Sequence, residues 1–276
     1  MTIVEVLKLS ADHLSKHGSD SPRLDAELLL AHTLGLSRLN LYLNFDRMLT
    51  APELDGYRGL VARRAKREPV AYLVGRKEFM GLEFEVTPAV LVPNPDTEIL
   101  VQRAVAIARE AHRRLRVADV GTGSGCIAIA IAHYAPDTEV WASDISDAAV
   151  SVARHNVATL GLETRVQVAC GDLMEPLSGS FDLICANLPY LALDADLPPE
   201  VKAQPAAALY AEKDGAALVN RLFEQAPARL KEGARLLAEI DPSIVAAVVE
   251  CSGRNFAQHR VHRDLGGHER VIEAWS

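Results

Sequence analysis

The tetrapeptide Asn187-Leu188-Pro189-Tyr190, which follows the apolar run 181–186, has residue types suited to chemistry on an amino group. The run predicts a buried strand, and open α/β sheets bind their ligands outside the carboxyl ends of such strands. The tetrapeptide offers an amide, a main-chain carbonyl, a rigid proline and an aromatic ring. Enzymes with Asn-Pro-Pro-Tyr in this position methylate an NH2 group attached to a planar π system. Leu188 stands where that motif has its first proline.

By itself the tetrapeptide has a plainer interpretation, because Asn and Pro are favoured in the turns that follow strands. A glycine-rich loop between a predicted strand, 116–121, and a predicted helix, 124–134, argues against that interpretation. Glycine is required where a turn needs backbone angles that are closed to other residues, or where a ligand approaches the main chain. The loop residues are Gly121, Thr122, Gly123, Ser124 and Gly125.

The spacing of this loop indicates which ligand it binds. A dinucleotide fingerprint requires its third glycine where Cys126 stands, and the Gly-Lys-Ser/Thr of a phosphate-binding P-loop is absent. With no pyrophosphate to hold, the loop suits S-adenosylmethionine, with S-adenosylhomocysteine as the product. No metal site is predicted, because the nine His residues form no HxH pair and the four Cys residues no CxxC pair.

Further residues at the strand ends support this cofactor. Asp144 ends the next predicted strand and is placed to accept hydrogen bonds from both ribose hydroxyls. Asp172, after the third strand, can accept from the adenine amino group, and Leu173 can pack on the adenine ring. We expect Asn187 to border the cofactor as well as the methyl acceptor, and Asp119 to be a structural acid or one near the methionine amino group.

The periodicity of apolar residues divides the chain into three parts. Residues 1–68 have apolar positions three and four apart, which predicts a small helical domain. Residues 69–95 alternate in part and predict a β-hairpin linker. In residues 96–276, apolar strands alternate with helices, which predicts a mainly parallel sheet covered on both faces.

Local signals predict several element ends. Ser21-Pro22 predicts the start of a helix, and Gly35 predicts its end. Thr50 and Glu53 have the spacing of a capping box. Asp96 or Thr97 is expected to cap a helix that runs to about residue 114. The basic runs 63–67 and 113–116 are expected to be solvated helix ends.

Composition limits the partners and the location. The net charge of -8 argues against a broad phosphate-binding surface, so we expect no direct nucleic acid partner. No apolar run is long enough for a membrane span. The four cysteines include no CxxC pair and are expected to be reduced, buried thiols. We expect a soluble, cytoplasmic monomer.

Several blocks beyond the tetrapeptide resemble the release-factor glutamine methyltransferase family, often called PrmC or HemK, and the resemblance covers nearly the whole chain. The blocks are Pro22-Arg23-Leu24-Asp25-Ala26-Glu27, Glu68-Pro69-Val70-Ala71-Tyr72, Glu78-Phe79-Met80-Gly81-Leu82, Val90-Leu91-Val92-Pro93-Asn94-Pro95-Asp96-Thr97-Glu98, and Asp264-Leu265 with Glu269-Arg270-Val271.

This resemblance implies a Rossmann-like class I methyltransferase domain, with a seven-stranded and mainly parallel sheet, in residues 96–276. It implies transfer of a methyl group from S-adenosylmethionine to the side-chain amide nitrogen (N5) of the glutamine in the Gly-Gly-Gln tripeptide of peptide chain release factors. The domain in residues 1–68 would then dock the release factor. Asn187 and the Leu188 carbonyl would accept the N–H groups of the glutamine, while Pro189 fixes the turn and Tyr190 packs on the amide plane.

Three positions depart from the family pattern. Leu188 replaces a proline, Asn94 an arginine and Gln204 a glutamate. If the usual arginine and glutamate pair, this chain has lost both ends of one interaction. Two alternatives therefore stay open: a DNA or RNA amino-methyltransferase acting on flipped bases, and a non-catalytic or diverged relative with a changed acceptor.

Overall fold

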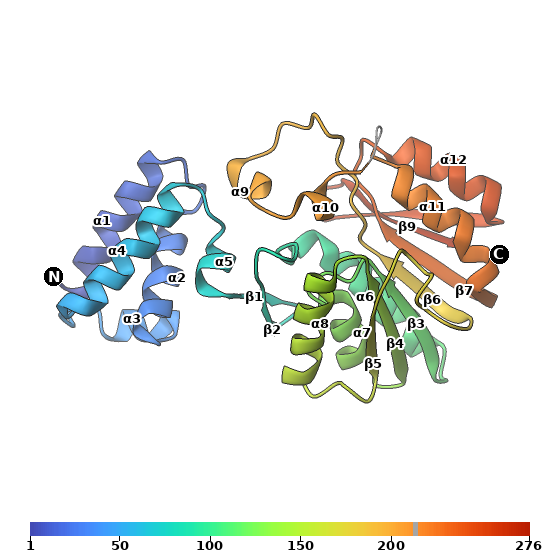
Figure 1. The fold of residues 1–276 in the computed structure, drawn as a ribbon, viewed down its shortest axis with the longest axis horizontal. Coiled ribbons are helices and arrows are strands. Elements are labelled where there is room, and N and C mark those ends of the chain that lie inside the picture. Colours follow the sequence, from blue (N-terminus) through green and yellow to red (C-terminus); the bar gives the residue numbers. More distant parts are fainter. Residues whose placement is uncertain (212–214) are drawn as a thin grey trace. The chain divides into compact units, whose positions relative to one another are not determined.

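The computed structural model describes residues 1–211 and 215–276. The described residues divide into two compact units (Figure 1). The helical unit comprises Met1–Arg76 together with Leu197–Ala203, and the sheet unit comprises Lys77–Asp196 together with Gln204–Ser276. None of the helices within the described ranges is long and apolar enough to span a membrane.

The helical unit confirms the predicted helical character of the first part of the chain. Its apolar core is formed by residues such as Leu14, Leu29 and Tyr57. The predicted capping box is present, since the Thr50 N–H donates to Glu53 at 2.9 Å, whereas Ser21 makes no side-chain cap. The helices are α1 (Ile3–Lys16), α2 (Pro22–Leu34), α3 (Arg38–Leu43), α4 (Ala51–Ala65) and α5 (Val70–Val74).

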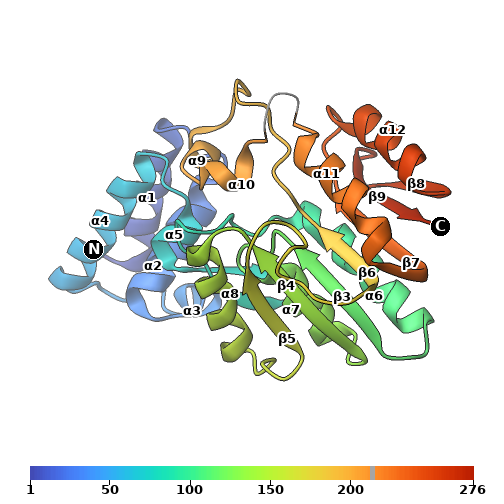
Figure 2. The ribbon, with the colours of Figure 1, turned by 45° about the vertical axis from the view of Figure 1, so that its right-hand side comes forward.

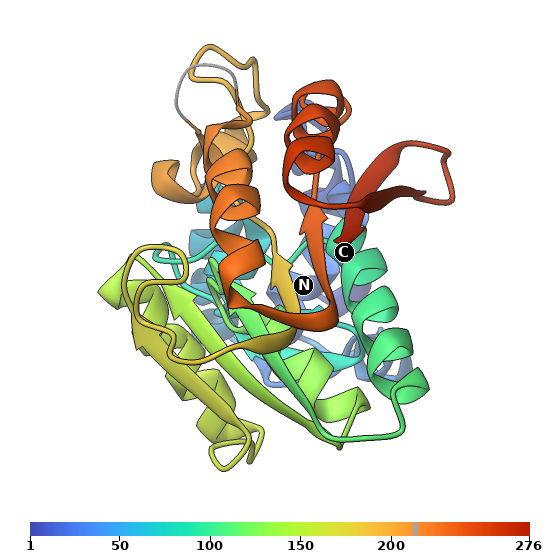
Figure 3. The same cartoon turned by 90° about the vertical axis from the view of Figure 1, so that its right-hand side faces the viewer.

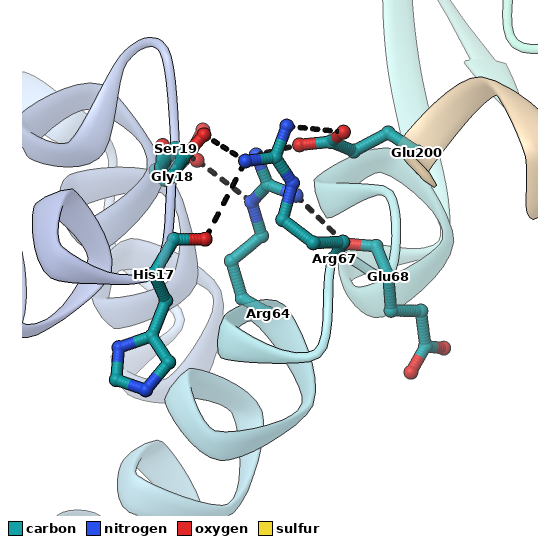
Figure 4. A network of polar contacts seen from close by, with 8 residues as sticks. His17, Gly18, Ser19, Arg64, Arg67, Glu68 and Glu200 are labelled. Atoms are coloured by element: carbon teal, nitrogen blue, oxygen red, sulfur yellow. Dashed lines mark hydrogen bonds and ion pairs between the residues drawn. The ribbon is translucent and has the colours of Figure 1, made fainter. Parts of the chain in front are cut away.

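The prediction that the basic run at the end of α4 is a solvated helix end is wrong for Arg64 and Arg67. Arg64 is only 6% exposed, and its Nε donates to Asp25 at 2.7 Å. Its Nη2 lies 2.8 Å from Glu200 of α9 (Pro199–Lys202), and Arg67 Nη2 lies 2.6 Å from the same carboxylate. Figure 4 shows both guanidinium groups directed at Glu200. These ion pairs hold the segment 197–203 within the helical unit.

The hairpin is shorter than the segment 69–95 in which it is predicted, because residues 70–74 are helical. It consists of β1 (Arg76–Phe79) and β2 (Leu82–Glu85). The large sheet has the order β5-β4-β3-β6-β7-β9-β8, in which only the pairs made by β9 are antiparallel (Figure 2). The strands are β3 (Leu115–Val120), β4 (Thr138–Asp144), β5 (Val166–Cys170), β6 (Phe181–Ala186), β7 (Leu230–Glu239), β8 (Gln258–Arg263) and β9 (Glu269–Trp275).

Helices cover both faces of this sheet, as predicted (Figure 3). Val117 of β3 belongs to the apolar cluster formed with α6, α7 and α8, and its neighbour Ala118 belongs to the opposite cluster, formed with α11 and α12. Cys170 is exposed, contrary to the prediction, because it ends the edge strand β5. The helices are α6 (Glu98–Glu110), α7 (Cys126–Tyr134), α8 (Asp147–Thr159), α10 (Ala206–Leu209), α11 (Ala217–Gln225) and α12 (Val245–Asn255), with the 3-10 turns η1 (Pro95–Thr97) and η2 (Ala226–Arg229).

The order of the strands reverses between β3 and β6, which are parallel neighbours. Chain connections leave in opposite directions at such a point, and a crevice opens at the carboxyl ends of the two strands. The glycine-rich loop follows β3 and the tetrapeptide follows β6. The sheet therefore places both predicted functional segments at one edge.

A buried carboxylate joins the antiparallel end of the sheet to α6. Glu273 is 1% exposed, and its oxygens accept from Arg103 of α6 at 2.9 and 3.0 Å. Arg235 also donates to it, and His262 Nε2 lies 2.7 Å away. Burial would raise the pKa of Glu273, but the hydrogen bonds from these three side chains lower it to about 2.

We predict that Glu273→Gln lowers the free energy of unfolding by about 3 kcal/mol at neutral pH, since it removes the buried charge that pairs with two partly buried arginines. A carboxylate with a lowered pKa stabilises the fold above its unfolded-state pKa of about 4.5 and loses that effect towards pH 2. The difference from wild type should therefore shrink below pH 4.5 in denaturant titrations. Glu269→Gln, in the more exposed pair with Arg263, should cost less than about 1 kcal/mol. A difference for Glu273→Gln that is independent of pH would contradict this account.

Candidate functional site

A cavity of about 330 Å³ lies at the carboxyl edge of β3, β4 and β6 in the sheet unit. This volume is in the range of small-molecule sites. Most of the predicted site residues line it, but Gly125 and Tyr190 do not. Those that do are Gly121, Thr122, Gly123, Ser124, Asp144, Asp172, Leu173, Asn187, Leu188 and Pro189.

Glycine is required at the first position of the loop for two reasons. Gly121 has a φ of 75°, in the left-handed region. A Cβ atom there would also stand 2.8 Å from Leu188 Cδ2. The side chain of Leu188 is thus packed against the loop and is only 4% exposed. Gly125, with a φ of 82°, forms the N-cap of α7 instead of lining the cavity.

Asp119 holds the loop from below and does not line the cavity. It is fully buried, and its Oδ2 accepts from the Thr122 hydroxyl at 2.6 Å and from the Ala128 N–H at 3.1 Å. Burial raises the pKa of Asp119 to about 7, although both hydrogen bonds act to lower it. These contacts make Asp119 a structural acid that joins the loop to the first turn of α7.

Asp144 ends β4 and lines the cavity, and its role as a ribose-binding carboxylate stays a prediction. Its Oδ2 accepts from the Gly123 N–H and its Oδ1 from the Ser146 N–H, both at 2.9 Å. An ionised carboxylate has about four acceptor positions, so further lone pairs remain on both oxygens. Since Asp144 also lines the cavity, it can accept two hydroxyl groups there.

Asp172 and Leu173 form another part of the cavity wall. Arg221 of α11 makes an ion pair with Asp172, and both side chains are partly exposed. The Ser143 hydroxyl donates to the Leu173 main-chain carbonyl at 2.7 Å. Leu173 has a φ of 44°, so this bond helps to hold an unusual backbone conformation for a branched residue. Ile145, 68% exposed, provides a further apolar lining residue that the sequence interpretation missed.

The tetrapeptide is anchored by two buried residues that were also missed. The Asn187 Nδ2 donates to the Thr97 hydroxyl oxygen at 3.1 Å. The Tyr190 hydroxyl lies 3.4 Å from Oε1 of Glu239, at the end of β7. Thr97 and Glu239 are each 2% exposed. Local sequence signals could not reveal these partners, because they lie 90 and 49 residues away along the chain.

The predicted helix cap near residue 96 is made by another residue. Thr97 makes no side-chain cap for α6. Instead, the Asn94 side chain accepts from the Asp96 N–H at 3.1 Å, which an arginine in this position could not do. Gln204 Oε1 accepts from the Val92 N–H at 2.9 Å. A glutamate could make the same bond, so this departure retains an acceptor at the position.

Comparisons with known proteins show the family of this chain. Residues 5–75 match the PrmC N-terminal domain and residues 95–200 the methyltransferase small domain. The chain is 39% identical to the release factor glutamine methyltransferase of Rhodopirellula baltica, over 98% of this chain and 95% of that one. It is 40% identical to that of Geobacter sulfurreducens, with the same coverage. The chain belongs to the release factor glutamine methyltransferase family.

Solved structures confirm the class of fold. The hMettl16 catalytic domain, solved with a MAT2A 3'UTR hairpin, aligns with 78% of this chain and 81% of its own at a TM-score of 0.58 and 17% identity. The Thermus thermophilus 16S rRNA N2 G1207 methyltransferase aligns with 73% of this chain and 49% of its own, at a TM-score of 0.55 and 18% identity. At these identities the likeness concerns the Rossmann-like fold alone.

As a member of the release factor glutamine methyltransferase family, the protein is a methyltransferase that uses S-adenosylmethionine. The cavity fits this cofactor. The glycine loop exposes main chain to it, Asp144 has acceptor positions for the ribose, and Ile145 and Leu173 provide apolar surface for the adenine ring. For the adenine amino group, Asp172 has to accept a hydrogen bond while it is paired with Arg221.

We predict that Asp144→Asn weakens S-adenosylmethionine binding about 10- to 100-fold, because it removes a charged acceptor worth about 1.5–3 kcal/mol. Isothermal titration calorimetry on the purified chain measures the affinity, and a thermal melt checks that the variant is folded. Asp147→Asn is the matched control, since Asp147 is exposed in the first turn of α8 and does not line the cavity. Equal affinities for the two variants would refute the assignment of Asp144.

Proposed function

We propose that this protein transfers a methyl group from S-adenosylmethionine to the side-chain amide nitrogen of the glutamine in the Gly-Gly-Gln tripeptide of peptide chain release factors. The observation that carries the proposal is the tetrapeptide at the cavity. Its Asn187 amide is held through the NH2 end, and Asn187 lines the same cavity as the glycine loop. The names of the full-length relatives support a release factor as the substrate.

The residues of the tetrapeptide match the needs of an amide acceptor. A carboxamide nitrogen is a poor nucleophile because its lone pair is delocalised, so the enzyme must hold its NH2 group and favour the positive charge that develops. The Asn187 side-chain oxygen and the Leu188 carbonyl accept one N–H each, which directs the nitrogen lone pair. Pro189 fixes the turn, and Tyr190 is held behind it by Glu239.

Bound S-adenosylmethionine supplies an electrophilic methyl group in this cavity. We expect the Gly121 to Gly125 loop, Asp144, Asp172 and Leu173 to hold the cofactor, and Asn187 to border both ligands. The reaction needs no strong base from the chain, since the acceptor nitrogen becomes acidic only as the methyl group arrives and its proton can leave to water.

The direct test measures the transfer of labelled methyl from S-adenosylmethionine to an unmethylated release factor. We expect label on the wild-type factor and none on a factor whose Gly-Gly-Gln glutamine is replaced by alanine. Label on both factors, or on neither, would contradict the proposal. Transfer to DNA or RNA in a parallel reaction would favour the nucleic acid alternative, which the net charge of -8 opposes.

We also propose that the helical unit docks the release factor. A small hollow between α1 and α3 is lined by Ile3, Leu7 and Leu41. Large apolar side chains around it are exposed, including Tyr42 at 48% and Phe45 at 57%. Clustered apolar residues of this kind are typical of protein interaction surfaces.

We expect Phe45→Glu to raise the KM for the intact release factor about tenfold or more, because it places a charge in an apolar contact. The kcat and the calorimetric affinity for S-adenosylmethionine should not change. Leu265→Glu is the matched control, since Leu265 is fully exposed on the sheet unit. If both variants shift the KM equally, docking on this surface is wrong.

We propose that the protein is a cytoplasmic monomer. All four cysteines are free, as is typical of proteins from a reducing compartment. Light scattering on the purified chain tests the monomer, for which a mass near 29.9 kDa is expected.

A further inference from the structure

Two residues of the target tetrapeptide depend on one buried carboxylate. Asn187 donates through its Nδ2 to Thr97, and Tyr190 donates through its hydroxyl to Glu239. The Thr97 hydroxyl lies close enough to the same Glu239 carboxylate to lower its pKa. A short polar chain therefore runs from Glu239 through Thr97 to the amide of Asn187.

This series of polar side chains, from Glu239 through Thr97 to Asn187, has no evident role in stability. Glu239 is 2% exposed, and its Oε2 has no hydrogen-bond partner among the described residues. A buried carboxylate oxygen without a partner destabilises a fold. The Thr97 hydroxyl, for its part, does not cap α6. What the two side chains do accomplish is to contact the tetrapeptide.

The proton count along this chain determines the orientation of the Asn187 amide. An ionised carboxylate can only accept, and a threonine hydroxyl has one proton to donate. When Thr97 donates that proton to Glu239, its oxygen can only accept from Asn187. The NH2 end of Asn187 must then face Thr97, and its oxygen must face away from Thr97.

We propose that Thr97 and Glu239 are positioning residues that orient the Asn187 amide so that its oxygen accepts the N–H of the methyl acceptor. The inference rests on the proposed function, since it concerns the binding of an NH2 group at Asn187. The reverse orientation would present the Asn187 NH2 to the NH2 of the acceptor, and two donors repel each other.

Protonation of Glu239 would reverse the direction of hydrogen-bond donation from Glu239 through Thr97 to Asn187. A protonated Glu239 can donate to Thr97, whose hydroxyl is then free to donate to the Asn187 oxygen. Burial raises the pKa of Glu239 to about 7, against the lowering effect of the Thr97 hydroxyl. Asp96 of η1, Arg270 of β9 and Tyr190 also affect the pKa of Glu239. The charge of Glu239 in turn raises the pKa of Cys126 of α7. The kcat should therefore fall as the pH drops through about 7.

The first test compares Thr97→Val, Thr97→Ser and Thr138→Val in methyl transfer to the release factor. Thr97→Val keeps the shape and removes the hydroxyl, so kcat should fall about 100-fold, with unchanged affinity for S-adenosylhomocysteine. Thr97→Ser should restore most of the activity. Thr138→Val is the matched control: Thr138 is 1% exposed, donates only to the Ala135 carbonyl, and begins β4 at the opposite edge of the sheet. Equal kcat values for the two valine variants would overturn the inference.

The variant Glu239→Gln shows whether the pH dependence of kcat comes from Glu239 or from Asp119, the other buried acid. The low-pH decrease in kcat should disappear in this variant, together with most of the activity at pH 8, because the new amide can donate to Thr97 at every pH. Asp119 has a pKa in the same region. If the pH dependence survives Glu239→Gln unchanged, it belongs to Asp119 or to another group, and the inference fails.

A measurement without any acceptor keeps the inference testable if release factor methylation fails. The side-chain NH2 of Asn187, identified in nitrogen-15 NMR spectra by its loss in Asn187→Asp, should be protected from hydrogen exchange in the wild type. Protection should be lost in Thr97→Val and retained in Thr138→Val. An Asn187 NH2 that exchanges equally in all three proteins would contradict the proposed orientation, whatever the acceptor is.

Discussion

The site depends on the parallel pairing of β3 with β6. Val120 and Ala186, the last residues of these strands, are register partners. The glycine loop and the tetrapeptide therefore begin side by side, and Leu188 packs so close to Gly121 that a Cβ atom there would clash with it. A shift of register would separate the cofactor loop from the acceptor site. The apolar clusters on both faces of the sheet, alternating along β3, hold that register.

Two buried acids at this edge of the sheet cost stability when they are ionised, and both hold segments of the site. Asp119 of β3 and Glu239 of β7 lie near the ends of the two strands that flank β6, and both have raised pKa values, chiefly because burial opposes their ionisation. A raised carboxyl pKa stabilises the fold at acid pH and costs stability as the pH rises through it. Asp119 holds the cofactor loop, and Glu239 holds the tetrapeptide. Strained or costly groups of this kind cluster at functional sites.

The predictable parts of the structure are those with local causes. The glycines of the loop, the apolar strand before Asn187 and the acid at the end of β4 have signals within a few residues, and the sheet and its cavity residues follow from them. The burial of Arg64 has no such signal, because it depends on Asp25 and Glu200 elsewhere in the fold. The link from Asn187 to Thr97 is equally invisible, since it joins two segments that only the folded sheet brings together. A helical stretch at 70–74 escaped because five residues carry too little periodicity.

The central claim is that the cavity methylates a release factor glutamine through Asn187. The most direct test is mass spectrometry of the Gly-Gly-Gln peptide of release factors purified from cells that lack this chain. The account predicts an unmethylated glutamine in those cells, one methyl group on its side-chain nitrogen after complementation with the wild-type chain, and none with Asn187→Ala. A glutamine that stays unmethylated with the wild-type chain, or becomes methylated with the Asn187→Ala variant, would contradict it.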